Sequence, residues 1–399
     1  MKGKIRTLLI ITIFSILSLF VFIIVTCFTL EVWARVNSRV TSVGVIGWQD
    51  DDVLGWISKP GKGKVITSEY TATYDINSYG MNDNPIEDTI EISRMRILAL
   101  GDSHTFAVGV NQEQSWPNVL EQILFKRDVK NGSVYNCAVA GYSLGQYLLQ
   151  MRRMAPIIKP HIVLIGFTIA SDVYDLLPPR KGGFVFGADR GRVYFDLDDK
   201  GNLVEIHDLV GKRFFSSQPK KATLIMIIRN AITRSAFYQR LKRSRLAMWI
   251  MMYVRPKGKT LWASPDTALA IELDEDYRYR WQLAEALIRK IGEEAKEYGA
   301  YAVLVNIPYL PQVYDGVWKS SFGRYPNEYD RWIAGYRLKA ICAKVGIYYV
   351  DVTQRFVDEA RIKKKWLHYP IDGHPNPVGH RIIAETVAEF LIKNQLVDY

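Results

Sequence analysis

The sequence predicts an α/β domain in which helices cover both faces of a central, parallel, five-stranded sheet. One observation favours this class, and the length and composition limit the alternatives. From residue 96 onward, short apolar segments alternate with amphipathic helical segments. The length of 399 residues suits two domains or one large domain with insertions. A composition with 48% hydrophobic and 23% charged residues excludes a disordered chain and a protein with many membrane spans.

An uncharged, mostly apolar run covers residues 8–30, ahead of this domain. As a helix it would be about 34 Å long, enough to cross a hydrocarbon core of about 30 Å. Three basic residues precede the run and one acid follows it directly: Lys2, Lys4, Arg6 and Glu31. By the positive-inside rule, we expect a cytoplasmic tail at 1–7, a transmembrane anchor at 8–30, and all later residues on the periplasmic or extracellular side.

Two alternatives to an uncleaved anchor stay open. A cleaved signal peptide usually has an apolar region of only about 7–15 residues and ends in a small-x-small site. The stretch Val25-Thr-Cys27 matches such a site poorly, and it matches a lipidated cysteine poorly as well.

Residues 31–95 are expected to form an exported lead-in that wraps the main domain. Short extended pieces in it are separated by turn residues such as Lys59-Pro-Gly61. The domain itself is expected at 96–399, in the sheet order 2-1-3-4-5. Its five strands are predicted at residues 97–100, 134–139, 161–166, 301–306 and 347–350, and its helices at 115–125, 277–298, 332–344 and 377–394.

An insertion at about 176–276 interrupts this alternation. It begins with a predicted hairpin at residues 192–204, which turns at Asp199-Lys-Gly-Asn202. Residues 207–260 follow, with thirteen Lys and Arg against the single acid Asp208. This segment is either a solvated basic face over an apolar stripe or an amphipathic element on anionic lipid or an anionic polymer. Nucleic acid is not expected as a partner of an exported chain.

Cysteine and histidine usage argues against disulfide and metal frameworks. The three cysteines cannot pair completely and form no close cluster: Cys27, Cys137 and Cys342. The six histidines show no HExxH spacing. We therefore expect no metal and no cofactor, and we expect Cys137 and Cys342 to be buried thiols.

The first predicted strand ends in Gly101-Asp-Ser103. A serine at this position lies at the edge where open α/β sheets bind ligands. Gly101 permits a tight turn, and the N–H groups that follow can stabilise an oxyanion. Ser103 is therefore a candidate nucleophile.

Asp372-Gly-His374 supplies the missing partners. It leads into the last helix, which Asn376 can cap and in which Pro377 fits the first turn. A carboxylate two residues before a histidine can hold one ring nitrogen and leave the other free to deprotonate a serine. Ser103, Asp372 and His374 together predict acyl transfer through a covalent acyl-serine.

From about Asp52 onward, the sequence resembles the SGNH/GDSL hydrolases, and in particular a membrane-anchored bacterial branch that modifies polysaccharides. The resemblance implies a flavodoxin-like three-layer fold, Ser103 as nucleophile, and Asp372 and His374 as the rest of the triad. The stretch from Asn136 to Ser143 matches the family's second block, which implies that the N–H of Gly141 joins that of Ser103 in the oxyanion hole.

One block departs from the family pattern. Where the family has Gly-x-Asn-Asp, this chain has Ile169-Ala-Ser171-Asp172, so Ser171 stands where the oxyanion-binding Asn is expected. Loss of one oxyanion donor can cost about 10²–10³ in rate. We expect structural roles for Asp172, His104 and His380, and none is assigned to His368.

The sequence thus predicts an exported serine esterase or acyltransferase that removes or transfers O-acetyl groups on an envelope polysaccharide. Two alternatives stay open. One is a lipid esterase at the membrane surface, with a lipid or lipid-linked substrate. The other is a weakened scaffold that binds glycan, which the substitution at Ser171 favours and the intact triad opposes.

Overall fold

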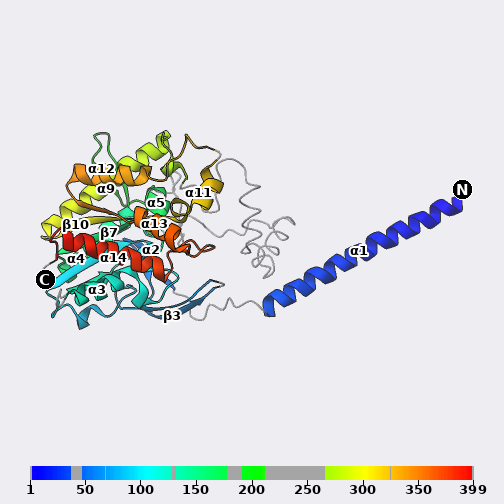
Figure 1. Ribbon diagram of the computed structural model, residues 1–399, viewed down its shortest axis with the longest axis horizontal. Coiled ribbons are helices and arrows are strands. Elements are labelled where there is room, and N and C mark those ends of the chain that lie inside the picture. The colour runs from blue at the N-terminus through cyan, green and yellow to red at the C-terminus, as the bar shows by residue number, and fades with distance from the viewer. Residues whose placement is uncertain are drawn as a thin grey trace. The chain divides into compact units, whose positions relative to one another are not determined.

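The computed structural model describes the chain except at both termini and in six internal segments (Figure 1). It has two compact units, Met1–Thr41 with Ser217–Val254 and Ser42–Ser216 with Arg255–Tyr399. Most of the predicted basic segment, residues 212–260, lies outside the described residues. The described ranges are 2–36, 47–67, 69–127, 132–177, 191–211, 266–323 and 325–397.

The N-terminal helix α1 covers Lys2–Val36 and so extends beyond the predicted anchor at both ends. Its segment Ile11–Trp33 has a mean hydropathy of 2.7 and no buried residue. Phe14, Phe22 and Phe28 are among its exposed apolar side chains. By length and composition this helix can cross a membrane, and a signal sequence near an N-terminus would meet the same criteria.

The larger unit is built on a five-stranded parallel sheet with the order β11-β10-β7-β5-β6, which confirms the predicted order 2-1-3-4-5. The chain forms β5, crosses to β6 on one side, and then returns to β7 on the other side of β5. The carboxyl ends of β5 and β7 therefore flank a topological switch point, where such sheets bind ligands. The strands are β5 (Met95–Gly101), β6 (Gly132–Asn136), β7 (Ile162–Thr168), β10 (Tyr301–Ile307) and β11 (Tyr348–Asp351).

Alternate strand residues face two separate cores. Leu98 and Leu100 of β5 belong to one core, whereas Ile97 and Ala99 belong to the other. The result is the expected three-layer arrangement, in which both faces of the sheet are buried (Figure 1). The first core includes α4 (Leu144–Ile158), α9 (Glu275–Glu297) and α12 (Ile333–Val345), and the second includes α3 (Trp116–Lys126), α13 (Thr353–Lys363) and α14 (Pro377–Lys393).

Helices α3, α9, α12 and α14 begin and end within two residues of the predicted bounds. Asn376 caps α14 as expected, because its side chain accepts hydrogen bonds from the N–H groups of Val378 and Gly379. The short helices of the same unit are α2 (Ser103–Phe106), α5 (Ile169–Asp172), α10 (Leu310–Val313) and α11 (Asp315–Phe322), with single 3-10 turns at Ile86–Asp88, Gln112–Gln114, Tyr174–Leu176 and Asp266–Leu269.

In the described ranges, three antiparallel hairpins accompany the sheet. Two of them form the lead-in, and its contacts with the domain are specific: the indole N–H of Trp56 donates to the carbonyl of Ala140 (3.2 Å), and the hydroxyl of Tyr142 donates to the carbonyl of Trp56 (2.6 Å). The third hairpin is the one predicted at the start of the insertion. They comprise β1 (Trp48–Asp51) with β2 (Gly55–Ser58), β3 (Gly61–Ile66) with β4 (Thr71–Ile76), and β8 (Tyr194–Leu197) with β9 (Leu203–Ile206).

The turn after β5 lies unusually close to the sheet. A Cβ atom at Gly101 would lie 2.2 Å from Oγ1 of Thr105, and one at Gly166 on β7 would lie 2.1 Å from the same atom. Thr105 is fully buried. Only glycine at both positions leaves room for Thr105, so these two residues determine how deeply α2 lies between the two strands.

We expect Gly166→Ala to destabilise the fold by about 1–3 kcal/mol, because the new methyl group overlaps Thr105. The free energy of unfolding of the full chain in detergent, followed by far-UV circular dichroism in denaturant, measures this. The control is Gly316→Ala in helix α11, where a Cβ would meet no atom within 4 Å, and we expect it to stabilise by about 0.5–1 kcal/mol. Equal effects of the two substitutions would contradict the close approach of Thr105.

Candidate active site

Ser103 lies where the sequence predicts it, at the carboxyl end of β5 in the first turn of α2. The side chain of Asp102 caps this turn by accepting a hydrogen bond from the N–H of His104 (2.8 Å). The turn ends at Ala107, whose φ of 74° is left-handed. Buried β5 and the cap thus present Ser103 at the switch point between β5 and β7.

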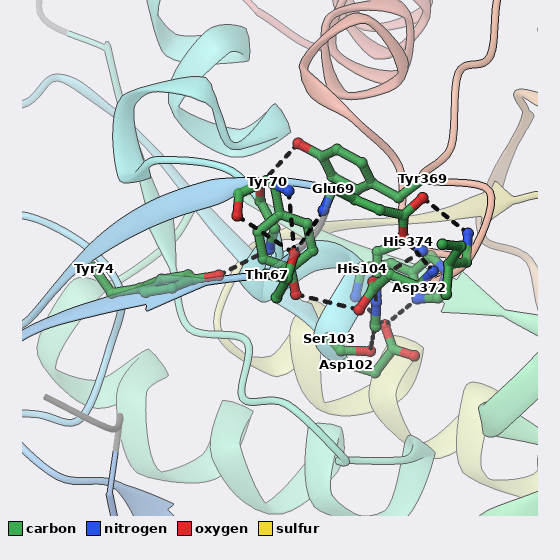
Figure 2. Close-up of polar contacts among 12 residues, drawn as sticks. Thr67, Glu69, Tyr70, Tyr74, Asp102, Ser103, His104, Tyr369, Asp372 and His374 are labelled. Atoms are coloured by element: carbon green, nitrogen blue, oxygen red, sulfur yellow. Dashed lines mark hydrogen bonds and ion pairs between the residues drawn. The ribbon is translucent and has the colours of Figure 1, made fainter. Parts of the chain in front are cut away.

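The structure brings Ser103, His374 and Asp372 together, although 271 residues separate the serine from the histidine. Nε2 of His374 lies 2.8 Å from Oγ of Ser103, and Nδ1 of His374 is hydrogen-bonded to Oδ1 of Asp372 (Figure 2). Gly373 between acid and base has a φ of 91°, which lets the loop turn so sharply that both side chains meet. The histidine thus has one nitrogen on the carboxylate and the other on the hydroxyl.

The charges of this site favour a basic histidine. Burial by itself would lower the pKa of His374, but the hydrogen bond and charge of Asp372, with a smaller effect of the Asp102 carboxylate, raise it above the usual value. Burial would raise the pKa of Asp372, yet its bonds to His374 keep that pKa below the usual value. The arrangement stabilises an imidazolium beside an ionised carboxylate.

Two residues of the lead-in hold the Asp372 loop, and the sequence analysis missed both. The Glu69 carboxylate accepts hydrogen bonds from the N–H groups of Ile371 (3.0 Å) and Asp372 (2.7 Å). The hydroxyl of Tyr70 donates to Oδ2 of Asp372 (3.2 Å), the oxygen that His374 does not use (Figure 2). Both follow strand β3 in an ordinary polar turn, and nothing in that turn indicates a partner about 300 residues away.

A pair of tyrosines holds the chain at Gly109, shortly after Ser103 in the sequence. Tyr369 donates its hydroxyl hydrogen to the carbonyl of Gly109 (2.8 Å), and Tyr74 accepts a hydrogen bond from the N–H of Gly109 (2.8 Å). Gly109 has a φ of 95°, and a Cβ there would lie 2.7 Å from the ring of Tyr369. The ring centroids of Tyr70 and Tyr369 are 4.8 Å apart, so the lead-in and the His374 loop share one aromatic cluster.

Gly141 and Ser171, the other two predicted oxyanion residues, follow β6 and β7 respectively. Gly141 has a φ of 83°, which by itself accounts for a glycine there. Ser171 lies in α5, where its hydroxyl donates to Oδ2 of Asp102 (2.6 Å). The role of both residues at an oxyanion stays a prediction.

The remaining polar candidates have structural contacts. Asp172 accepts hydrogen bonds from the hydroxyl of Tyr147 (2.6 Å) and the N–H of Thr168 (2.8 Å). Nδ1 of His380 accepts from the N–H of Trp116 (3.2 Å), and Nε2 of His368 lies 3.1 Å from the carbonyl of Pro308. Burial lowers the pKa of both histidines to about 3, so they are neutral.

The described part of the chain contains no group of three His, Cys, Asp or Glu side chains that could hold a metal ion. Cys137 and Cys342 are buried, as expected. The thiol pKa of each is raised by burial. Neither takes part in the contacts around Ser103.

The sequence profile of one family, described as GDSL-like Lipase/Acylhydrolase, matches residues 97–387. The match covers most of the chain, and this protein therefore belongs to the GDSL lipase/acylhydrolase family. The resemblance seen in the sequence is confirmed, although nothing confirms the membrane-anchored branch. No curated protein sequence matches the chain significantly.

Three solved structures, two of them of esterases, are similar to this one. A catalytic mutant of Axe2, an acetylxylan esterase from Geobacillus stearothermophilus, is 14% identical, with 77% of this chain and 98% of that one covered and a TM-score of 0.38. TesA is 14% identical, with 76% and 100% covered and a TM-score of 0.37. The psychrotrophic esterase EstA from Pseudoalteromonas is 12% identical, with 75% and 98% covered and a TM-score of 0.36.

We expect Glu69→Ala to lower the stability of the domain by about 1–3 kcal/mol, because two partly buried N–H groups of the Asp372 loop lose their acceptor. Hydrogen exchange followed by mass spectrometry should show faster exchange at residues 369–374. Asp75→Ala is the matched control: Asp75 lies on the same hairpin, and its ion pair with Lys62 (3.0 Å) is exposed, so the expected change is within about 0.5 kcal/mol. Unchanged exchange in the Glu69 variant would contradict its role as an anchor of this loop.

Proposed function

We propose that this protein is an exported esterase or acyltransferase that works through an acyl-Ser103 intermediate and acts on O-acetyl groups of an envelope polysaccharide. One observation carries the chemistry: His374 lies between the hydroxyl of Ser103, at 2.8 Å, and the carboxylate of Asp372. This is the arrangement by which a neutral imidazole activates a serine. Membership of an acylhydrolase family supports the same reaction class.

In the first half of the reaction, Nε2 of His374 takes the proton of Ser103 while Oγ attacks the ester carbonyl. The tetrahedral intermediate carries a negative charge on the former carbonyl oxygen, which the N–H groups of Ser103 and Gly141 stabilise. Asp372 orients His374 and stabilises its positive charge. When the intermediate collapses, the bond to the leaving alcohol breaks, and the alcohol takes the proton from His374.

In the second half, His374 removes a proton from the acceptor, and the acceptor oxygen attacks the acyl carbonyl. Water as acceptor gives hydrolysis, and a sugar hydroxyl gives transfer. The proton returns through His374 to Oγ of Ser103 as the acyl–serine bond breaks. Both outcomes need the same residues and differ only in which acceptor reaches the acyl-enzyme.

The proposal of an envelope substrate rests on helix α1 and on the aromatic residues near the triad. A helix long enough to cross a membrane would hold the domain at the cell surface, on the periplasmic or extracellular side. Tyr70 and Tyr369 are partly exposed beside Asp372, and aromatic rings offer flat, amphipathic faces of the kind that sugar rings contact. The basic residues of 207–260 would suit an anionic glycan or lipid-linked carrier.

A lipid esterase is the competing function, and the same membrane-length helix favours it. An enzyme held at a bilayer would meet long acyl chains, whereas a polysaccharide esterase would meet acetyl groups. The two functions therefore differ in the preferred acyl length.

We expect the full chain in detergent to hydrolyse p-nitrophenyl acetate, and we expect Ser103→Ala to remove this activity down to the background rate. In subtilisin, loss of the triad serine costs about 10⁶ in kcat, so the variant should retain no measurable turnover. The control Ser320→Ala changes a serine of α11 whose hydroxyl donates to the carbonyl of Val317, and it should keep full activity. Comparing acetate with octanoate and palmitate esters then separates a polysaccharide esterase from a lipid esterase.

If the folded wild-type chain shows no turnover that depends on Ser103, with either simple esters or acetylated polysaccharide, the esterase is excluded. A preference for palmitate over acetate would contradict the polysaccharide substrate and leave the acyl-serine chemistry in place.

We expect kcat/KM to fall as the pH is lowered through a midpoint above about 6.5, the pKa of an ordinary histidine. The base must be neutral to accept the proton of Ser103, and Asp372 raises the pKa of His374, so activity is lost at a higher pH than for an unperturbed histidine. Asp372→Asn should move the midpoint down and lower kcat by on the order of 10⁴. A midpoint that stays the same in this variant would contradict the role of Asp372.

A further inference from the structure

We propose that Ser171 acts through the buried carboxylate of Asp102 rather than as a donor to the oxyanion, and that Asp102 is a second positioning carboxylate for His374. This inference rests on the proposed acyl-Ser103 chemistry. It assigns a function to Asp102, which the sequence left without one, and a different function to Ser171.

Asp102 is almost completely buried, with 1% of its surface exposed. One carboxylate oxygen accepts a hydrogen bond from the N–H of His104 (2.8 Å), and the other accepts from the hydroxyl of Ser171 (2.6 Å). Burial would raise the pKa of Asp102, but His104 and the hydrogen bond of Ser171 outweigh burial and keep it below the usual value. The carboxylate is therefore ionised next to the nucleophile.

A serine hydroxyl has one proton to donate. At 2.6 Å, the contact of Ser171 with Asp102 has the length of a charge-assisted bond, whereas the carbonyl of Thr168 is 3.5 Å away. Turning that proton toward an oxyanion would leave a buried carboxylate with one donor fewer, which is costly. The hydroxyl therefore stays on Asp102, and the N–H groups of Ser103 and Gly141 remain as the donors available to an oxyanion.

Asp102 also acts on His374. Its charge contributes to the raised pKa of His374, after the larger effect of Asp372. His104 contacts both residues. Its Nδ1 lies 3.5 Å from Oδ1 of Asp102, and its ring centroid lies 4.9 Å from that of His374 (Figure 2). Two carboxylates thus stabilise the imidazolium. Besides burial, the charge of Asp102 raises the pKa values of Tyr147 on α4 and of Asp172 and Asp175 after β7. Besides burial, His104 and His374 lower the pKa values of His368 and His380.

A double-mutant cycle on the full chain tests this proposal. It compares Ser171→Ala, Asp102→Asn and the double variant by kcat/KM with p-nitrophenyl acetate. Asn keeps the oxygen that caps α2, so Asp102→Asn removes the charge and retains the turn. Ser93→Ala is the matched control. Ser93 makes a 2.6 Å side-chain hydrogen bond with Ser133, and this contact lies at the end of β5 that is far from Ser103.

We expect Ser171→Ala to lower kcat/KM by about three- to tenfold, the effect of one hydrogen bond, and to have no further effect in the Asp102→Asn background. We also expect Asp102→Asn to move the acid midpoint of kcat/KM downward, because a negative charge near His374 is lost. Ser93→Ala should change neither quantity.

Three outcomes would overturn the proposal. A loss on the order of 10²–10³ in Ser171→Ala that recurs in the Asp102→Asn background would make Ser171 an oxyanion donor. A decrease in kcat/KM of less than twofold in Ser171→Ala would show that the Ser171 hydroxyl does not act through Asp102. An unchanged acid midpoint in Asp102→Asn would show that Asp102 does not act on His374.

A second measurement separates failure of this inference from failure of the proposed function. Titration of ¹³C-labelled histidine and aspartate by NMR follows His374 and Asp102 without any turnover. We expect a lower pKa of His374 in Asp102→Asn and a higher pKa of Asp102 in Ser171→Ala. If these shifts occur in a chain without esterase activity, the inference holds and the function fails. If they are absent, the inference fails whatever the activity.

Discussion

The close approach of the Ser103 turn to the sheet is the constraint on which the site depends. Thr105 occupies the space that a Cβ atom would fill at Gly101 and at Gly166. The neighbouring strands β5 and β7 therefore fix the position of α2. With α2 fixed, Asp102 is buried and Ser103 faces outward at the switch point. The nucleophile is positioned by a strand, a cap and a tight fit.

The remaining parts of the site come from loops, and a second network holds them. The His374 loop is bound to the lead-in by Glu69 and Tyr70, and the Gly109 loop is bound by Tyr74 and Tyr369. Precise chemistry on loops requires such support, because an unsupported loop would let the histidine move relative to the serine. The lead-in is therefore part of the site, although it lies outside the sheet.

The sequence predicted the sheet, four of its covering helices and the meeting of Ser103 with His374, because strand periodicity, helix caps and short motifs are local signals. It did not specify α4, whose Gln146 and Gln150 are buried among apolar residues and obscure the helical period. It also missed α13, where only Thr353, Phe356 and Val357 are buried. The contacts of Glu69, Tyr70 and Ser171 depend on the tertiary structure, and no local pattern encodes them.

The separation of the nucleophile from its base has a consequence for the order in which the chain is made. Ser103 is synthesised long before His374, which follows 271 residues later. A nascent chain in which β5, β6 and β7 have already formed would hold its serine without a base or an acid partner. The serine would then become reactive only when the His374 loop docks against the lead-in. The order of synthesis and folding would thus keep the nascent chain unreactive toward esters.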